Sequence, residues 1–404
     1  MGKAWTARRD FPPLLTNRRG FIDCFPATAR RFSLQCPIDQ SLLGEICEGD
    51  AVEVDAAIAA AERAFPAWSA MGTAQRKPYL DRFAAEIGKR ADAFCVLESN
   101  DAGVLLSRMR HGVVPRAMLN ITWFAEHALS LQDRPIDTDQ AHHIVRHDPA
   151  GVVAIVTTWN APLMLSTGKL GPALAAGNTC VLKPPEWAPL TCSLLADAAH
   201  AAGLPPGVFN VVQGSGALTG ARLVSDPRIA RVSFTGSVAT AKWIAQAAGA
   251  NLVPCSLELG GKSPFIVLED ADLDGAAATG ALMYRNAGQV CLAGTRLLVH
   301  EKVADRRLWL GRRVLRRDRA RHRHRPAGAH RLHLGEQLRH PRPGGSVRRH
   351  QALGRRPRGV RMRGILRGTA VKFMARGSAC SYWSFHARYP GKGMPFHTAS
   401  KVQS

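Results

Sequence analysis

The chain has 404 residues, of which 46% are hydrophobic, so it is long enough for two or more domains with their own cores. Its formal net charge of +23 is confined to one end. Residues 306–404 contain 26 Lys and Arg against 2 Asp and Glu, whereas residues 1–305 contain 28 against 29. No apolar run approaches the ~20 residues that a membrane-spanning helix needs, which argues against an integral membrane protein.

Nine cysteines lie at positions 24, 36, 47, 95, 180, 192, 255, 291 and 380, with no CxxC pair. Their odd number and irregular spacing are not typical of a disulfide framework or a zinc site. The N-terminal MGKAWTARRDF is basic and lacks the apolar core of a secretory signal. We therefore expect reduced thiols, no bound metal and a cytoplasmic protein.

The first 130 residues predict mainly helices. Residues 1–48 are irregular, although FSLQC and LLGEIC could form short strands. The apolar period of DAVEVDAAIAAAERAF predicts a helix with Asp50 as N-cap. A second helix is expected in TAQRKPYLDRFAAEIGKRADAFCVLES with Thr73 as its cap, and a third over 116–131. The segment HHIVRH resembles one strand of a hairpin.

From residue 150 onward, short β-branched runs alternate with helical segments. The expected strands are GVVAIVTTW, NTCVLKP, VFNVVQG, ARVSFTG, SPFIVLE and RLLVHE. Helices are expected between them, one of them over 274–286. This alternation predicts βαβ units, hence an α/β fold with a parallel sheet that binds ligands at the carboxyl ends of its strands.

Four short segments contain residues suited to covalent catalysis. NAGQVC ends in Cys291 after a predicted helix, and LELGGK places Glu258 before a Gly-Gly turn. VTTWN puts Asn160 just past a buried strand, and VLKPPE puts Lys183 and Glu186 at the end of another. Each has an ordinary structural explanation: a buried cysteine, a solvated turn, a helix cap, a charged loop. Around one sheet they form a candidate nucleophilic site.

Two glycine-containing segments are candidates for phosphate binding. GSGALTG (214–220) has the spacing GxGxxxG and lacks the acidic residue of a dinucleotide fingerprint, so it is the weaker candidate. FTGS (234–237) ends a predicted strand, and a helix follows whose first amides could meet a phosphate.

Taken in order, VTTWN, KLGPALAAGN, VLKPPEWAPLT, AGLPPGVFNVV, SFTGS, LELGGKSP and NAGQVC resemble the NAD(P)-dependent aldehyde dehydrogenase family. The resemblance covers roughly residues 30–305 and is densest from 150 to 300. It implies that Cys291 is the nucleophile, that Glu258 is the general base, and that Asn160 and the Cys291 N–H form the oxyanion hole.

The resemblance also implies cofactor contacts from Lys183 and Glu186 to the adenosine ribose and from Gly236 and Ser237 to the pyrophosphate. Trp159 and Leu259 are expected in the same cofactor site. A carboxylate beside the ribose repels a 2′-phosphate, so NAD is expected rather than NADP. The reaction would oxidise an aldehyde to a carboxylic acid; PLMLST and EWAPLT favour a semialdehyde, with betaine aldehyde next. The family often has an aromatic residue where this chain has Gly168.

The expected organisation is a unit of N-terminal helices and a Rossmann-like NAD-binding domain over 1–257, with its core over 150–257. Residues 130–150 would form a hairpin that serves oligomerisation in the family. A partial catalytic domain would follow over 258–305. We expect an aldehyde substrate, a homo-oligomer in intact relatives, and no membrane partner.

The basic segment 306–404 has no apolar period and is expected to be disordered. Read one base forward, HLGEQLRHPRPGGSVRRHQALGRRPRG (333–359) can encode TWVNSFAIRDLAAPFGGIKRSGVGREG, which resembles the C-terminal part of the same family. We interpret this segment as out-of-frame translation combined with an internal deletion, and expect weak activity. The alternatives are a nucleic-acid-binding arm, which would show steeply salt-dependent binding, and an inactive fragment.

Overall fold

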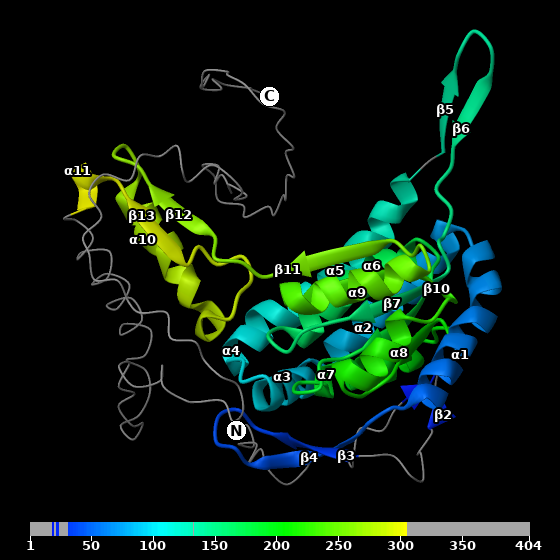
Figure 1. The fold of residues 1–404 in the computed structure, drawn as a ribbon, viewed down its shortest axis with the longest axis horizontal. Coiled ribbons are helices and arrows are strands. Elements are labelled where there is room, and N and C mark those ends of the chain that lie inside the picture. The colour runs from blue at the N-terminus through cyan, green and yellow to red at the C-terminus, as the bar shows by residue number, and fades with distance from the viewer. Residues whose placement is uncertain (1–17, 20–21, 24–30, 132, 305–404) are drawn as a thin grey trace. The chain divides into compact units, whose positions relative to one another are not determined.

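The computed structural model describes residues 18–19, 22–23, 31–131 and 133–304 (Figure 1). The fold is α/β, as expected. The chain divides into two compact units: one comprises Met1–Gly261 and Tyr284–Cys291, and the other comprises Lys262–Met283 together with the residues from Leu292 onward. The predicted boundary between 257 and 258 falls within the strand Cys255–Leu259, and the predicted division into domains stays a prediction. Both Glu258 and Cys291 belong to the first unit.

A five-stranded parallel sheet forms the centre of the first unit, in the order β11-β10-β7-β8-β9. Its strands are β7 (Val152–Val156), β8 (Thr179–Lys183), β9 (Phe209–Val211), β10 (Ile229–Gly236) and β11 (Cys255–Leu259). Every residue of β7, β8 and β9 is buried. Burial on both faces explains their continuous apolar composition.

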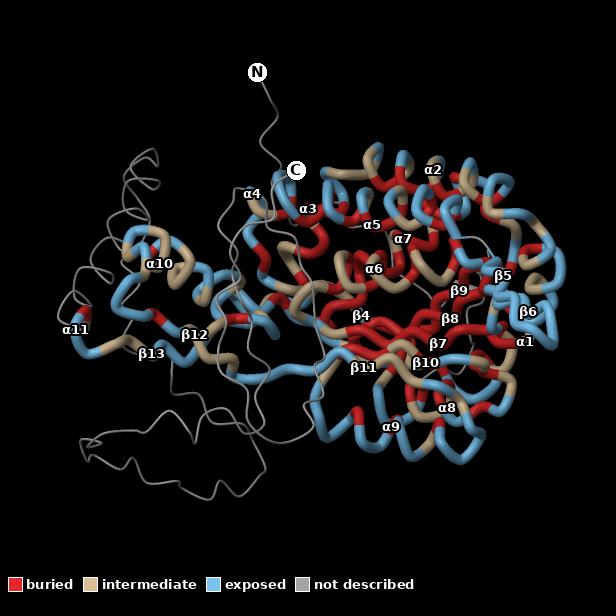
Figure 2. Tube along the Cα trace, turned by 90° about the horizontal axis from the view of Figure 1, so that it is seen from above, coloured by how far each residue is buried: buried red, intermediate tan, exposed pale blue. Residues whose placement is uncertain are grey.

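Alternate residues of β7 and β8 contribute to two different hydrophobic clusters. Figure 2 shows these strands as buried, between helices. Val153 and Ile155 face a large cluster that contains side chains of α2 (Thr73–Lys89), α5 (Val114–His127), α6 (Pro162–Ala175) and α7 (Leu190–Ala201). Val152 and Ala154 face side chains of α1 (Ala51–Ala70), α8 (Ala221–Val224) and α9 (Val238–Ala250). The sheet is thus covered by helices on both faces, which is the three-layer arrangement that βαβ units produce.

The N-terminal elements agree with the sequence with one correction. The first four residues of FSLQC lie in β3 (Arg31–Gln35), and LLGEIC forms β4 (Leu42–Cys47); the two strands pair antiparallel. Asp50 caps α1 through a capping box with Glu53. Thr73 is not the cap of α2: Gly72 holds that position and Thr73 is the first helical residue. The predicted second helix is two helices, α2 and α3 (Ala91–Asp101).

Short elements complete the first unit. β1 (Arg18–Arg19) pairs with β2 (Ile22–Asp23). Before α5 come α4 (Leu106–Arg108) and a π-helical turn over Met109–Val113. The predicted hairpin is present as β5 (Arg134–Asp137) and β6 (His142–Val145), and all eight of its strand residues are exposed. Its role in oligomerisation stays a prediction.

The second unit contains β12 (Pro264–Val267), α10 (Leu273–Gly280), β13 (Arg296–Val299) and α11 (Glu301–Ala304). β12 and β13 pair in parallel. The helix expected over 274–286 ends at Gly280, and a 3-10 segment follows over Ala281–Gly288. Asn286 and Ala287 in that segment have φ near +55°, a left-handed conformation that ends helical structure before Cys291.

The predictions for residues 306–404 lie outside the described residues. Within the described part of the chain, no helix is both long and apolar enough to cross a bilayer.

Candidate active site

The candidate residues follow the carboxyl ends of four adjacent strands. Asn160 lies four residues after β7, and Lys183 is the last residue of β8. Gly236 ends β10, where it pairs with Leu259 of β11, and Thr235 pairs with Glu258. Parallel strands end at one edge of their sheet, so the fold gathers segments separated by about a hundred residues along one edge.

The Asn160 side chain contacts the segment that leads to Cys291. Its Nδ2 donates to the Gln289 carbonyl at 2.7 Å, and its Oδ1 accepts from Thr158 Oγ1 at 2.5 Å. In return, Asn286 Nδ2 donates to the Asn160 carbonyl at 2.8 Å. These bonds hold the residues just before the cysteine against the end of β7. The amide that would stabilise an oxyanion is here satisfied by a backbone carbonyl.

Cys291 is exposed, whereas Cys36, Cys47, Cys95, Cys180 and Cys192 are buried and Cys255 is half-buried. Burial raises the pKa of the Cys95, Cys180, Cys192 and Cys255 thiols, which makes their thiolates less accessible. Cys291 is therefore the cysteine best placed to react among those that the structure describes. No hydrogen bond among the described residues joins Cys291 to Glu258.

Glu258 is an exposed residue of β11, and a half-buried lysine lies near it. Lys169 of α6 donates from Nζ to Ser233 Oγ at 3.1 Å. Burial lowers the Lys169 pKa to about 8, and the charge of Glu258 opposes this shift. We did not identify Lys169 from the sequence. Its signal in the sequence is a single charged residue in the stretch LSTGKLGPALAAG.

Lys183 and Glu186 lie together at the carboxyl end of β8. Lys183 is only 3% exposed, and its Nζ lies 3.8 Å from Glu186 Oε2. Burial lowers the Lys183 pKa to about 8, while the charges of Glu186 and Glu48 oppose the shift. A buried ammonium beside a half-buried carboxylate can bind hydroxyl groups through a donor and an acceptor at the same point.

Gly236 and Ser237 form the junction between β10 and α9. A Cβ atom at Gly236 would overlap the Phe234 ring, so only glycine fits this close approach. Ser237 is the N-cap of α9, and its Oγ accepts from Thr240 N at 3.1 Å. The first amides of a helix lack intrahelical partners and favour anions. Trp159, 44% exposed, and Leu259, 36% exposed, follow β7 and end β11.

A family model described as "Aldehyde dehydrogenase family" matches residues 25–314. The chain belongs to the aldehyde dehydrogenase family. It is 38% identical over 300 residues to mitochondrial benzaldehyde dehydrogenase of Antirrhinum majus, and 40% identical over 292 residues to betaine aldehyde dehydrogenase 1 of Oryza sativa subsp. japonica. These alignments cover 73% and 70% of this chain but 56% and 58% of those proteins. The chain thus spans a little over half the length of these relatives.

Solved structures of aldehyde dehydrogenases are also similar to this chain. A mutant of the indole-3-acetaldehyde dehydrogenase AldA of P. syringae, in complex with NAD⁺ and IAA, matches with a TM-score of 0.68 and 37% identity. An E. coli NADP-dependent enzyme matches with a TM-score of 0.71 and 36% identity. The matches cover 70% and 75% of this chain and 59% and 63% of those chains.

In this aldehyde dehydrogenase chain the GSGALTG segment is occupied by protein contacts. Glu186 Oε2 accepts from Gly216 N at 2.8 Å, and Ser215 N donates to Glu48 Oε1 at 3.3 Å. Ser215 caps the π-helical turn Gly216–Gly220 through Leu218 N. The segment therefore positions Glu186, and we do not assign it a phosphate.

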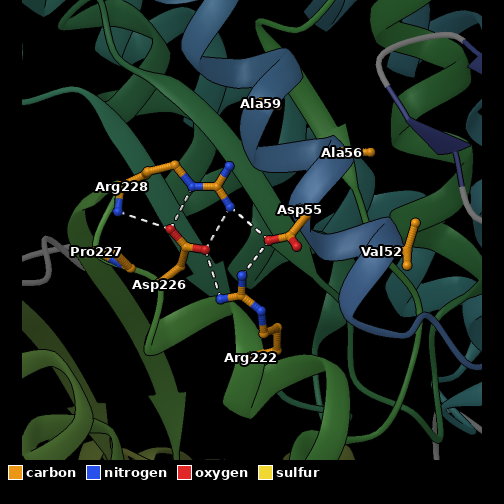
Figure 3. Close-up of a pocket in the computed structure, with 8 residues that line it drawn as sticks. All are labelled: Val52, Asp55, Ala56, Ala59, Arg222, Asp226, Pro227 and Arg228. Carbon is orange, nitrogen blue, oxygen red and sulfur yellow. Dashed lines mark hydrogen bonds and ion pairs between the residues drawn. The ribbon is translucent and has the colours of Figure 1, made fainter.

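A hollow between α1, α8 and the residues just before β10 is shown in Figure 3. It is lined by four charged residues (Asp55, Arg222, Asp226 and Arg228) and four apolar ones (Val52, Ala56, Ala59 and Pro227). Asp226, 1% exposed, accepts from Arg228 Nε at 2.8 Å and lies 2.7 Å from Arg222 Nη1. Asp55 of α1 bonds to both arginines. These arginines are engaged with carboxylates, so the network stabilises the joint between α1, α8 and β10 and is not a ligand site.

Proposed function

We propose that this aldehyde dehydrogenase homologue oxidises an aldehyde to a carboxylic acid through a covalent intermediate on Cys291, with NAD as cofactor. The observation that carries the proposal is the pair of hydrogen bonds between Asn160 and the 286–289 segment, because they bring the exposed cysteine's segment to the strand end that carries the amide.

The first steps assign a role to each reacting side chain. Glu258 takes the thiol proton, and the Cys291 thiolate forms a bond to the aldehyde carbon. The carbonyl electrons move to oxygen, where Asn160 Nδ2 and the Cys291 N–H stabilise the charge. Asn160 must release the Gln289 carbonyl to do this, and the developing oxyanion is the stronger acceptor.

The second half releases the acid. Loss of hydride from the former aldehyde carbon leaves a thioester on Cys291, and bound NAD supplies the hydride acceptor. Glu258, after passing the thiol proton to solvent, takes a proton from water; the hydroxide adds to the thioester carbon, and the Cys291 thiolate leaves with the electrons of the C–S bond. Glu258 is exposed, so water reaches it readily in this chain.

The residues that we assign to NAD have suitable chemistry. Lys183 and Glu186 supply a donor and an acceptor for ribose hydroxyls, and the start of α9 supplies helix N-terminal amides for the pyrophosphate. The missing Cβ at Gly236 lets the backbone approach. The Glu186 carboxylate disfavours a 2′-phosphate, hence NAD over NADP.

The substrate class rests on the relatives. Those described above act, by name, on benzaldehyde, betaine aldehyde and indole-3-acetaldehyde, which share only the aldehyde group. An added Cβ at Gly168 would lie in ordinary van der Waals contact with Asn120 Nδ2, at 3.5 Å, so this glycine does not by itself open a pocket. We propose an aldehyde substrate, and the predicted semialdehyde is one member of the panel to be tested. The nucleic-acid alternative depends on residues 306–404, outside the described part of the chain.

Thiol labelling and cofactor binding test this function. Iodoacetamide should label Cys291 faster than the half-buried Cys255, and NAD should bind more tightly than NADP in calorimetric titration. Asn160→Ala should lower any turnover by about 10²–10³-fold with little change in NAD affinity. Cys255→Ser is the control that shows the effect of removing a thiol other than that of Cys291. Absence of NAD binding, or equal labelling of both thiols, would refute the proposal.

A further inference from the structure

Two buried carboxylates on α3 contact the starts of two helices in the first unit. Glu98 Oε2 accepts from Leu163 N of α6 at 3.0 Å. Asp101 Oδ2 accepts from Leu190 N of α7 at 2.9 Å. The two acids are three residues apart and so lie on one face of α3. They are 0% and 3% exposed, respectively.

The helices that receive these contacts cannot cap themselves. The N-cap residue of α6 is Ala161 and that of α7 is Pro189, and neither side chain has an acceptor. A helix start without an acceptor leaves amides unsatisfied, which is costly when the start is buried. The α3 carboxylates supply the missing acceptors from a separate element.

The capped helices follow the two loops of the candidate site. α6 begins two residues after Asn160, and α7 begins four residues after Glu186. Glu98 Oε2 also accepts from Thr191 Oγ1 at 3.0 Å, so one carboxylate bonds to both helices. Burial of two carboxylates costs free energy that apolar side chains would not. A role in positioning accounts for this cost.

We propose that Glu98 and Asp101 are positioning residues: through the starts of α6 and α7 they hold the Asn160 loop and the Lys183–Glu186 loop in the geometry that binds cofactor and substrate. This inference rests on the proposed function for the identity of the ligands. The two acids differ in the helices that they contact. Asp101 contacts α7 alone, whereas Glu98 contacts both helices.

The test measures ligand affinity in the full chain. AMP, which carries only the adenosine half of NAD, should bind roughly tenfold more weakly to Asp101→Leu, because Leu190 N loses its acceptor. Asp101→Asn retains an oxygen acceptor and should restore affinity to within about threefold of the wild type. Glu98→Leu should weaken both AMP binding and the labelling preference for Cys291 over Cys255, whereas Glu98→Gln should restore both.

A matched control separates positioning from a general loss of stability. Leu80→Ala removes a fully buried side chain of α2, an element that carries neither loop. It should lower Tm as much as Asp101→Leu while leaving the AMP affinity unchanged. An AMP affinity that tracks Tm across all variants, or that is unchanged in Asp101→Leu, overturns the inference. If the wild type binds no AMP, the proposed function fails instead.

Discussion

A side chain at position 236 would collide with the strand that carries it. Gly236→Ala places a Cβ inside van der Waals contact with the end of the Phe234 ring, and Phe234 is buried, so the ring must move within a packed core. We expect a loss of about 1–3 kcal/mol in the free energy of unfolding and a weaker NAD affinity. Urea titration and calorimetry measure the two effects.

Gly249→Ala is the control for this substitution. Gly249 lies within α9, the helix that follows Gly236, and an added Cβ there meets nothing within 4 Å. Alanine should raise stability there by about 0.5–1 kcal/mol. A Gly236→Ala variant that binds NAD as the wild type does would contradict the proposed close approach of cofactor to backbone.

Asp226 is the residue whose charge contributes most clearly to stability. Hydrogen bonds from Arg228, and then from Arg222, lower its pKa to about 2 from an ordinary 3.8, even though burial opposes the shift. A lowered carboxyl pKa gives stability that is complete above about pH 4 and is lost as the pH falls toward 2. At neutral pH this contribution is about 1–2 kcal/mol, because the two arginines are partly exposed and solvent screens their charge.

Asp226→Asn should therefore destabilise the chain near pH 7 and lose less stability than the wild type between pH 4 and 2. Chemical denaturation at each pH gives both curves. Asp81→Asn is a suitable control, because Asp81 is a partly exposed residue of α2 that pairs with Lys77 one turn away. Parallel curves for wild type and Asp226→Asn would show that the network carries no charge-dependent stability.

At the scale of elements, the sequence predicted what depends on local pattern. The strands β7 to β10 and the helices between them are continuous apolar or periodic runs, and the Asp50 cap is a local signature. The errors arise where neighbours in space decide. Gly72 rather than Thr73 caps α2, and the helix before Cys291 ends at Gly280. Nothing local indicates that Asn286 exchanges a hydrogen bond with a residue 126 positions away.

The candidate site shows the same division. Five candidate residues stand in motifs and could be named from the sequence: Cys291, Glu258, Asn160, Lys183 and Glu186. The structure places the last four at or just after strand ends, and Asn160 contacts Gln289, two residues before Cys291. Lys169, Glu98 and Asp101 could not be predicted, because their importance lies in burial and in partners on other helices. Local sequence patterns do not show contacts between residues that are distant in the sequence.

The start of α9 gives a prediction at the same scale. Ser237→Ala removes the side chain that accepts from Thr240 N, so stability should fall by about 1 kcal/mol and NAD affinity should fall with it. Asp272→Ala removes the cap of α10 by the same chemistry, in the other compact unit. It should cost a similar stability and leave NAD affinity unchanged. If both variants lowered NAD affinity equally, the start of α9 would not be part of the pyrophosphate site.

At the scale of the whole molecule, charge divides the chain. Residues 1–305 are nearly neutral and contain the family motifs, whereas the positive charge lies in 306–404. The out-of-frame interpretation of that segment stays a prediction. It requires coding DNA in which the next reading frame across 333–359 encodes the family-like string. Sequencing that DNA decides it, and any other string in that frame would reject the interpretation.

The stability of the whole chain should also depend on pH through Glu98. Burial raises the Glu98 pKa to about 7 from 4.5, against the bonds from Leu163 N and Thr191 Oγ1. The groups that act on it electrostatically include Asp101, Cys192 and Arg108, and burial likewise raises the Asp101 pKa. Because the folded state holds this proton more tightly, the associated stability is complete below about pH 4.5 and is lost as the pH rises through 7.

Glu98→Gln keeps an oxygen acceptor and cannot ionise, so it should be less sensitive to this change. The free energy of unfolding of the wild type should fall relative to the variant between pH 5 and 8, measured by urea titration in buffers of equal ionic strength. Glu62→Gln, at an exposed residue of α1 that pairs with Arg228, should follow the wild-type curve across that range. A constant difference between wild type and Glu98→Gln would mean that Glu98 is already ionised at pH 5, and that the start of α6 is held by a full charge throughout.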